Sequence, residues 1–102
     1  MSPKAIQDYC AAHVNLALAR QYPVYFSGAP ECCEACGRSL AAEEFLGDCE
    51  IPGQNGWALF CGHCITAHRL TFGWGRGQLY QRVSDEDGEW LLVAGFPPPE
   101  TN

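Results

Sequence analysis

The chain has 102 residues, of which 47% are hydrophobic and 18% are charged, with seven cysteines and a net charge of −6. A chain of this length forms one domain around a single core, burying roughly two thirds of the surface that the unfolded chain exposes. The hydrophobic share excludes a solvated disordered tail, and no apolar run approaches the ~20 residues of a membrane span. The acidic balance disfavours a protein that coats nucleic acid or an anionic membrane through bulk charge.

Whether seven cysteines indicate disulfides or metal ligands depends on the cellular compartment of the protein. The N-terminal stretch MSPKAIQDYC lacks the apolar segment of a signal peptide, so we expect a cytoplasmic protein. An odd number of cysteines in a chain without an export signal argues against a pure disulfide framework. Metal coordination is therefore the first interpretation to test against the cysteine spacing.

The N-terminal segment 1–23 predicts one amphipathic helix from Pro3 to Tyr22. Ser2 is a suitable N-cap, and proline is favoured at the first helical position. Pro23 ends the helix because proline cannot continue the hydrogen-bond ladder. Apolar side chains repeat every four residues and form one stripe along it: Ile6, Cys10, Val14 and Leu18.

The middle of the chain predicts short elements around the cysteines. Residues 24–26 read as a short strand before a turn, and residues 57–60 read as a buried strand that runs directly into Cys61. A short helix is predicted over 61–70. The pattern between Leu40 and Leu46 is compatible with either a helix or a strand.

The segment 71–96 predicts a C-terminal β-hairpin, with strands at 78–83 and 90–96 and a polar turn at 84–88. The second strand is apolar at every position, which is typical of a strand covered on both faces. Its core candidates are Trp90, Leu91, Leu92 and Val93. Residues 97–102 begin with three prolines and predict an extended tail.

Two pairs of cysteines have the spacing of metal ligands. Cys33 and Cys36 are separated by two residues, as are Cys61 and Cys64, and 24 residues lie between the pairs. Zinc in structural sites takes four tetrahedral ligands, and each CxxC step delivers two thiolates to one ion. The segment 32–70 is therefore predicted to bind a structural Zn²⁺ ion through these four cysteines.

The surroundings of the two pairs differ. Gly37 follows the first pair, as in a zinc knuckle, whereas the second pair falls at the expected start of a helix. This arrangement resembles treble-clef zinc fingers, and the resemblance implies a small α+β fold with a closed metal centre. It implies little about activity, because such domains bind nucleic acids, bind proteins or catalyse reactions. A zinc ribbon, with both pairs on knuckles, is the alternative.

Two other residues could replace a predicted ligand. Cys32 would give a three-residue gap to Cys36, although the two-residue step followed by glycine is the commoner geometry. His68 follows Cys64 by four residues and would face the same side of the helix, where we expect it to pack near the metal centre. The remaining thiols, Cys10 and Cys49, are expected to be core residues or unreactive.

The residues after the second pair carry an unusual charge pattern. From Ile65 to Val83 there are three arginines and no acidic residue, whereas the last 19 residues hold five acidic residues and no basic one. If the chain is extended from Gly73 onward, alternation places four recognition side chains on one face: Trp74, Arg76, Tyr80 and Arg82. Such a face suits a protein partner or unpaired bases. Alternatively, the aromatic rings belong to the core.

Four thiolates would close the zinc site, and the chain lacks a convincing set of acid, base and nucleophile, so we expect no enzyme. The favoured hypothesis is an acidic protein-binding adaptor or regulator, including an inhibitor of a nucleic-acid-binding protein. The alternative is a nucleic-acid-binding zinc finger that uses the arginine and aromatic strip 69–82. The sequence names no partner and does not fix the oligomeric state.

Overall fold

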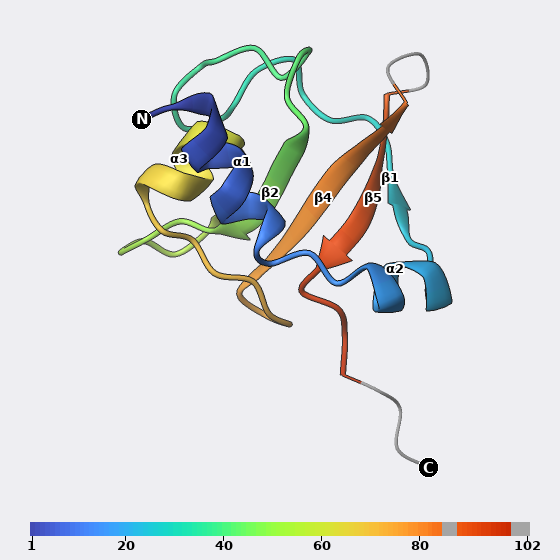
Figure 1. The fold of residues 1–102 in the computed structure, drawn as a ribbon. Helices are drawn as coiled ribbons and strands as arrows, with labels where there is room; N and C mark the ends of the chain where they lie inside the picture. Colours follow the sequence, from blue (N-terminus) through green and yellow to red (C-terminus); the bar gives the residue numbers. More distant parts are fainter. Residues whose placement is uncertain (85–87, 99–102) are drawn as a thin grey trace.

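The computed structural model describes residues 1–84 and 88–98 (Figure 1). Within these residues, five strands form one antiparallel sheet in the order β1-β5-β4-β2-β3. The strands are β1 (Tyr25–Phe26), β2 (Phe45–Glu50), β3 (Trp57–Cys61), β4 (Gly77–Ser84) and β5 (Glu89–Ala94). Three helices accompany them: α1 (Pro3–Ala11), α2 (Leu16–Gln21) and α3 (Gly62–Ala67). The predicted α+β class is confirmed.

The single N-terminal helix predicted from Pro3 to Tyr22 is wrong. It begins as expected, with the Ser2 hydroxyl accepting a hydrogen bond from the backbone N–H of Ala5. After α1, however, the chain turns, and Asn15 caps α2 by accepting from the N–H of Leu18 at 3.1 Å. The N–H of Asn15 donates to the Val93 carbonyl at 2.7 Å. This long-range bond to β5 offsets the helical bonds lost at the break, and the sequence pattern could not reveal it.

The C-terminal hairpin forms, with β4 and β5 paired, but it is part of a larger sheet. On its other side β4 pairs with β2, which in turn pairs with β3. In the order β1-β5-β4-β2-β3, β4 is therefore the central strand. The sequence left residues 40–46 undecided, and these include only the first two residues of β2, the apolar beginning of the strand. Its buried positions include Gly47 and Cys49, whose small side chains do not produce a strand pattern.

The helices pack on the sheet at different places (Figure 1). α1 lies against α3, and α3 covers β2 and β3, while α2 lies beside β5. The side chain of Ile65 in α3 approaches Gly47 so closely that a Cβ there would lie 3.0 Å from its Cδ1 atom. One continuous core results, and its fully buried aliphatic side chains are Leu46, Ile65, Leu79 and Val93. Trp90 and Leu92 are buried as predicted, whereas Leu91 is half-buried.

The helix predicted over 61–70 is shorter than expected. α3 ends at Ala67, and Arg69 follows with φ 49°, in the left-handed region that favours glycine. The N–H of Arg69 donates to the Thr66 carbonyl and that of Leu70 to the Ile65 carbonyl, at 3.1 and 3.0 Å. These bonds form a Schellman motif, which satisfies the last helical carbonyls. An arginine in this position hides the helix end from sequence reasoning.

The chain is not extended over residues 73–76, so the condition on which the alternating face depended is not met there. Gly73 and Gly77 form an isolated bridge, and the N–H of Arg76 donates to the Gly73 carbonyl, so these residues make a tight turn before β4. Alternation therefore does not place Trp74 and Arg76 on the face of Tyr80 and Arg82. Gly73 and Gly75 lie in this turn, whereas Gly77 begins β4 and allows that strand to approach its neighbours closely.

Some predictions fall on positions outside the described ranges: residues 85–87 of the hairpin turn, four of the five acidic residues of the last segment, and the tail from Pro99 onward. Among residues 1–84 and 88–98, no helix has the length and apolar character needed to cross a membrane.

Candidate metal centre

The first cysteine pair lies on a tight turn that projects from the loop between β1 and β2. Backbone bonds close this knuckle: the N–H of Cys33 donates to the Arg38 carbonyl at 2.7 Å, and the N–H of Gly37 donates to the Cys33 carbonyl at 2.9 Å. Gly37 has φ 78°, which explains why glycine follows the second cysteine. Residues 33–38, the knuckle, thus form a turn closed by glycine, as the sequence indicated.

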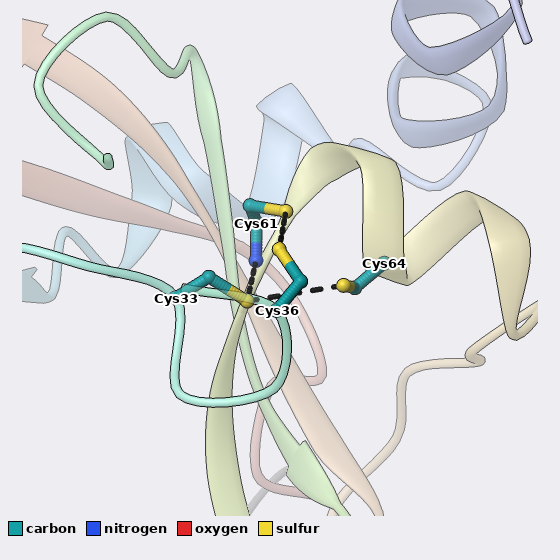
Figure 2. Close-up of side chains that lie close together, drawn as sticks. All are labelled: Cys33, Cys36, Cys61 and Cys64. Atoms are coloured by element: carbon teal, nitrogen blue, oxygen red, sulfur yellow. Dashed lines mark hydrogen bonds between the residues drawn. The ribbon is translucent and has the colours of Figure 1, made fainter. Parts of the chain in front are cut away.

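The second pair lies where β3 passes into α3 (Figure 2). Cys61 is the N-cap of α3 with an extended backbone, and Cys64 lies on the first turn. A strand that ends directly in a helix N-terminus orients both thiols toward the knuckle. The positive end of the helix favours ionised sulfur over the neutral thiol, but burial outweighs this effect and raises the pKa of both cysteines.

Figure 2 shows the four sulfur atoms converging between the knuckle and the helix. All lie within 4.8 Å of one another, with Cys33 and Cys64 sulfurs 3.8 Å apart and Cys36 and Cys61 sulfurs 3.7 Å apart. A tetrahedron with zinc–sulfur bonds of about 2.3 Å has edges of about 3.8 Å, whereas a disulfide would need about 2.05 Å. Two of the six sulfur–sulfur separations therefore match a tetrahedral zinc site, and the four cysteines form a cluster that could hold a metal ion.

The thiols respond differently to this environment. Burial favours the neutral thiol of Cys33, but backbone N–H groups of Cys61, Cys36 and Ala35 donate to its sulfur and bring its pKa down to about 7. Burial raises the pKa of Cys61 to about 11, and it also raises the pKa of Cys64. One thiolate thus forms readily, and a bound divalent cation would supply the charge that lets the others ionise.

Two glutamates that the sequence reasoning missed fasten the knuckle and the helix. Glu34, inside the first CxxC, accepts a hydrogen bond from the N–H of Leu59 at 2.7 Å, and its own N–H donates to the Leu59 carbonyl at 3.0 Å. The knuckle therefore binds the outer edge of β3 two residues before Cys61. Glu43 accepts from the N–H of Gly62 at 2.9 Å and satisfies a free donor at the start of α3. No local signal identifies either contact, because both join residues at least 19 positions apart.

Arg82 holds the loop that carries these groups. Its Nε donates to the Glu43 carbonyl at 2.8 Å, its Nη2 donates to the Leu40 carbonyl, and its guanidinium lies 4.4 Å from the centre of the Trp90 ring. β4 is thereby connected to the segment between the knuckle and β2. These contacts give the Arg82 guanidinium a structural role in the fold.

We expect Arg82→Ala to destabilise the zinc-loaded chain by about 2 kcal/mol, because hydrogen bonds from a charged donor contribute about 1.5–3 kcal/mol and this side chain is only half-buried. Urea denaturation measures the loss. Arg20→Ala is the matched control, since Arg20 is exposed on α2 and its removal should change the free energy of unfolding by less than about 0.5 kcal/mol. Equal, small effects of both substitutions would contradict the structural role of Arg82.

The candidate replacement ligands lie outside the cluster. Cys32 is exposed and forms a backbone bridge with Ser39, while His68 lies at the C-terminal end of α3. Cys10 and Cys49 are buried core residues, and burial raises their pKa values to about 11 and about 12, respectively. Both thiols therefore stay neutral at pH 7, in agreement with the expectation that they are unreactive.

The predicted recognition residues are dispersed. Trp74 is 63% exposed in the turn before β4, and Arg76 belongs to the same turn. Tyr80 is half-buried, with its ring 5.4 Å from that of Phe26. With Arg82 engaged by loop carbonyls, the four side chains do not make the continuous face that alternation implied. Their role in binding stays a prediction.

Fold and site together define a small α+β domain with a four-cysteine metal-binding cluster that joins a knuckle to the N-terminus of a helix. Comparisons of the chain with protein-family models, with curated proteins and with solved structures find no match. What the domain does must therefore be argued from its own residues.

Proposed function

We propose that the chain binds one structural Zn²⁺ ion and acts as a protein-binding adaptor or regulator. The observation that carries the metal assignment is the sulfur geometry, whose 3.7 and 3.8 Å separations match a tetrahedral zinc–thiolate site. Four thiolate ligands also suit zinc better than harder cations, which prefer oxygen. A site closed by four protein ligands leaves no position on the metal for water or substrate. We therefore propose a structural rather than a catalytic role for the ion.

The order of elements supports a centre of the treble-clef type. A knuckle provides two thiols, a hairpin of β2 and β3 follows, and α3 provides the other two. A zinc ribbon would place both pairs on knuckles, whereas Cys61 and Cys64 lie at a helix N-terminus. In this arrangement the ion connects the long loop before β2 to the sheet and to α3.

Two exposed tryptophans suggest where a partner docks. Trp57 is 44% exposed at the start of β3, and Trp74 is 63% exposed in the turn before β4. Both lie at the same end of the sheet, because Trp57 pairs with Glu50, whose N–H donates to the carbonyl of Arg76 in the turn that holds Trp74. Tryptophan and arginine are the residues most enriched at the energetic centres of protein interfaces.

The charge of the molecule bears on the kind of partner. Four thiolates on one zinc ion add a net charge of −2, which brings the chain from −6 to about −8. A strongly acidic domain associates fastest with a basic surface, and the DNA- or RNA-binding site of another protein is one such surface. An inhibitor of a nucleic-acid-binding protein is the specific form of regulator that this charge supports.

Affinity purification with the zinc-loaded chain tests this proposal. We expect a stoichiometric protein partner that is lost from the double variant Trp57→Ala, Trp74→Ala and retained by Leu16→Ala, which removes a side chain 47% exposed on α2. Retention of the partner by the double variant would contradict the assigned surface. Direct binding of an oligonucleotide, steeply weakened by salt and by Arg76→Ala, would instead assign the chain to the nucleic-acid-binding class.

A further inference from the structure

A hollow of about 510 Å³ lies beside α3 and is separate from the four cysteines. Three segments line it: residues 49–55, which run from the end of β2 into the loop before β3, residues 68–71, which follow α3, and Arg76 in the turn before β4. Pockets that bind small molecules have volumes of roughly 300 to 1,000 Å³. The hollow is thus large enough for a ligand of nucleotide size.

Exposed basic side chains without partners line this hollow. Arg69 and Arg76 both contribute to it, together with His68, and their side chains have no hydrogen-bond or ion-pair partner among residues 1–84 and 88–98. The chain has only six lysines and arginines, and of these Lys4 pairs with Asp8 while Arg82 is engaged by the loop. Arg20 and Arg38 are likewise exposed and unpartnered among the described residues, so Arg69 and Arg76 are distinguished by lining one hollow of an acidic protein together.

The backbone at Arg69 adds a second observation. Arg69 occupies the left-handed position of the Schellman motif, where a side chain costs conformational energy and glycine does not. Strain of this kind persists where the side chain contributes something that glycine cannot. Arg69 lines the hollow, and a cation there is a contribution that glycine could not make.

The position of Arg76 is also specified. Its guanidinium lies over Gly73, where an added Cβ would be 2.7 Å from Nη2 and 3.1 Å from Nε. Any side chain at residue 73 would displace the guanidinium group. The glycine turn therefore does more than reverse the chain, because it leaves the space in which the Arg76 head group sits.

We propose that this hollow binds the phosphate group of a small ligand of nucleotide size. Guanidinium groups bind phosphate oxygens through paired, charge-assisted hydrogen bonds, and two arginines with one imidazole offer more donors than a single carboxylate ligand would use. The amides of Gln54 and Asn55 line the same hollow and can hold polar groups of the ligand. Glu50 provides the one carboxylate of the lining and would accept from ligand hydroxyls while repelling the phosphate. This site is separate from the four cysteines, and it adjoins the proposed docking surface because Arg76 lies in the same turn as Trp74.

A nuclear magnetic resonance titration of the zinc-loaded full chain tests the proposal, with three probes: inorganic phosphate, adenosine monophosphate and adenosine. We expect saturable shifts of the amides in 53–55 and 68–71 and of the Nε–H groups of Arg69 and Arg76. Phosphate and the monophosphate should both cause them, whereas adenosine should not. Tighter binding of the monophosphate than of inorganic phosphate would indicate that the rest of the hollow is used, and equal binding would indicate a site for phosphate alone.

Variants of opposite expected sign sharpen the test. Arg76→Ala should weaken phosphate binding about tenfold, because it removes a charge-assisted contact, and Gly73→Ala should weaken it as well by displacing the same guanidinium. Arg69→Gly should weaken binding while raising the free energy of unfolding, so loss of binding cannot be ascribed to misfolding. Glu50→Gln should strengthen binding several-fold by removing the repulsion. Arg20→Ala, which removes an equal charge on α2, should leave binding unchanged.

Three outcomes would overturn the proposal: no saturable shift with either phosphate probe, equal weakening by Arg20→Ala and Arg76→Ala, or shifts in the hollow with a thymidine oligonucleotide but not with the small probes. The last result would assign the two arginines to a nucleic-acid backbone.

Discussion

Cys33→Ser is expected to abolish stoichiometric zinc binding and to unfold much of the domain, whereas Cys32→Ser should bind zinc and fold normally. The two cysteines are adjacent in the chain, but only Cys33 belongs to the sulfur cluster. Structural zinc contributes about 10–16 kcal/mol in zinc-finger peptides, which equals or exceeds the 5–15 kcal/mol stability of a typical domain. Native mass spectrometry measures the zinc content, and circular dichroism measures the folded fraction.

A strong chelator added to the unmodified chain should have the same effect as Cys33→Ser. The loop from 27 to 44 should be the first segment to lose its structure, because the ion holds its knuckle against β3 and α3 while Glu34, Glu43 and Arg82 hold it at only a few further points. Full removal of zinc without change in the circular dichroism spectrum would contradict a structural role. Loss of zinc from Cys32→Ser would show that the ligand set is different.

The metal site could be predicted from the sequence because its information is local. Each CxxC step fixes two ligands within one turn of chain, and Gly37 indicates a knuckle by its position alone. The contacts that hold the two pairs together are not local: Glu34 reaches Leu59, Glu43 reaches Gly62, and Arg82 reaches Leu40. Glutamate and arginine at these positions are indistinguishable from ordinary surface residues until the fold brings their partners close.

The errors in the predicted elements have the same origin. Asn15 breaks the N-terminal helix because it caps α2 and bonds Val93, which is 78 positions away. β2 escaped prediction because close contact with α3 requires glycine at position 47, and glycine does not signal a strand. Arg69 ends α3 in a conformation that the sequence would assign to glycine. In each case tertiary packing or a backbone conformation that the residue type does not indicate overrides the local pattern.

Gly95→Ala is expected to destabilise the zinc-loaded domain by about 3 kcal/mol or more, which corresponds to a fall in melting temperature of about 15 °C. Gly95 follows β5 with φ +82°, a conformation that costs about 1–2 kcal/mol for any other residue. An added Cβ would also collide with the Gly77 carbonyl oxygen and lie 3.0 Å from the Cα of Gln78. These are backbone atoms of the central strand β4, which is held by β2 and β5 on its two sides and cannot yield.

Gly28→Ala separates the two contributions to this loss. Gly28 has nearly the same φ, +80°, but no atom lies within 4 Å of the position that its Cβ would take. Its substitution should therefore cost only the conformational part, about 1–2 kcal/mol. Urea denaturation of both variants at saturating zinc gives the difference, which measures the collision with β4. If Gly95→Ala and Gly28→Ala lose the same stability, the chain after β5 can shift away from β4 and relieve the collision. The bond from the Asn15 N–H to Val93, which positions α2, would then be the next contact to test.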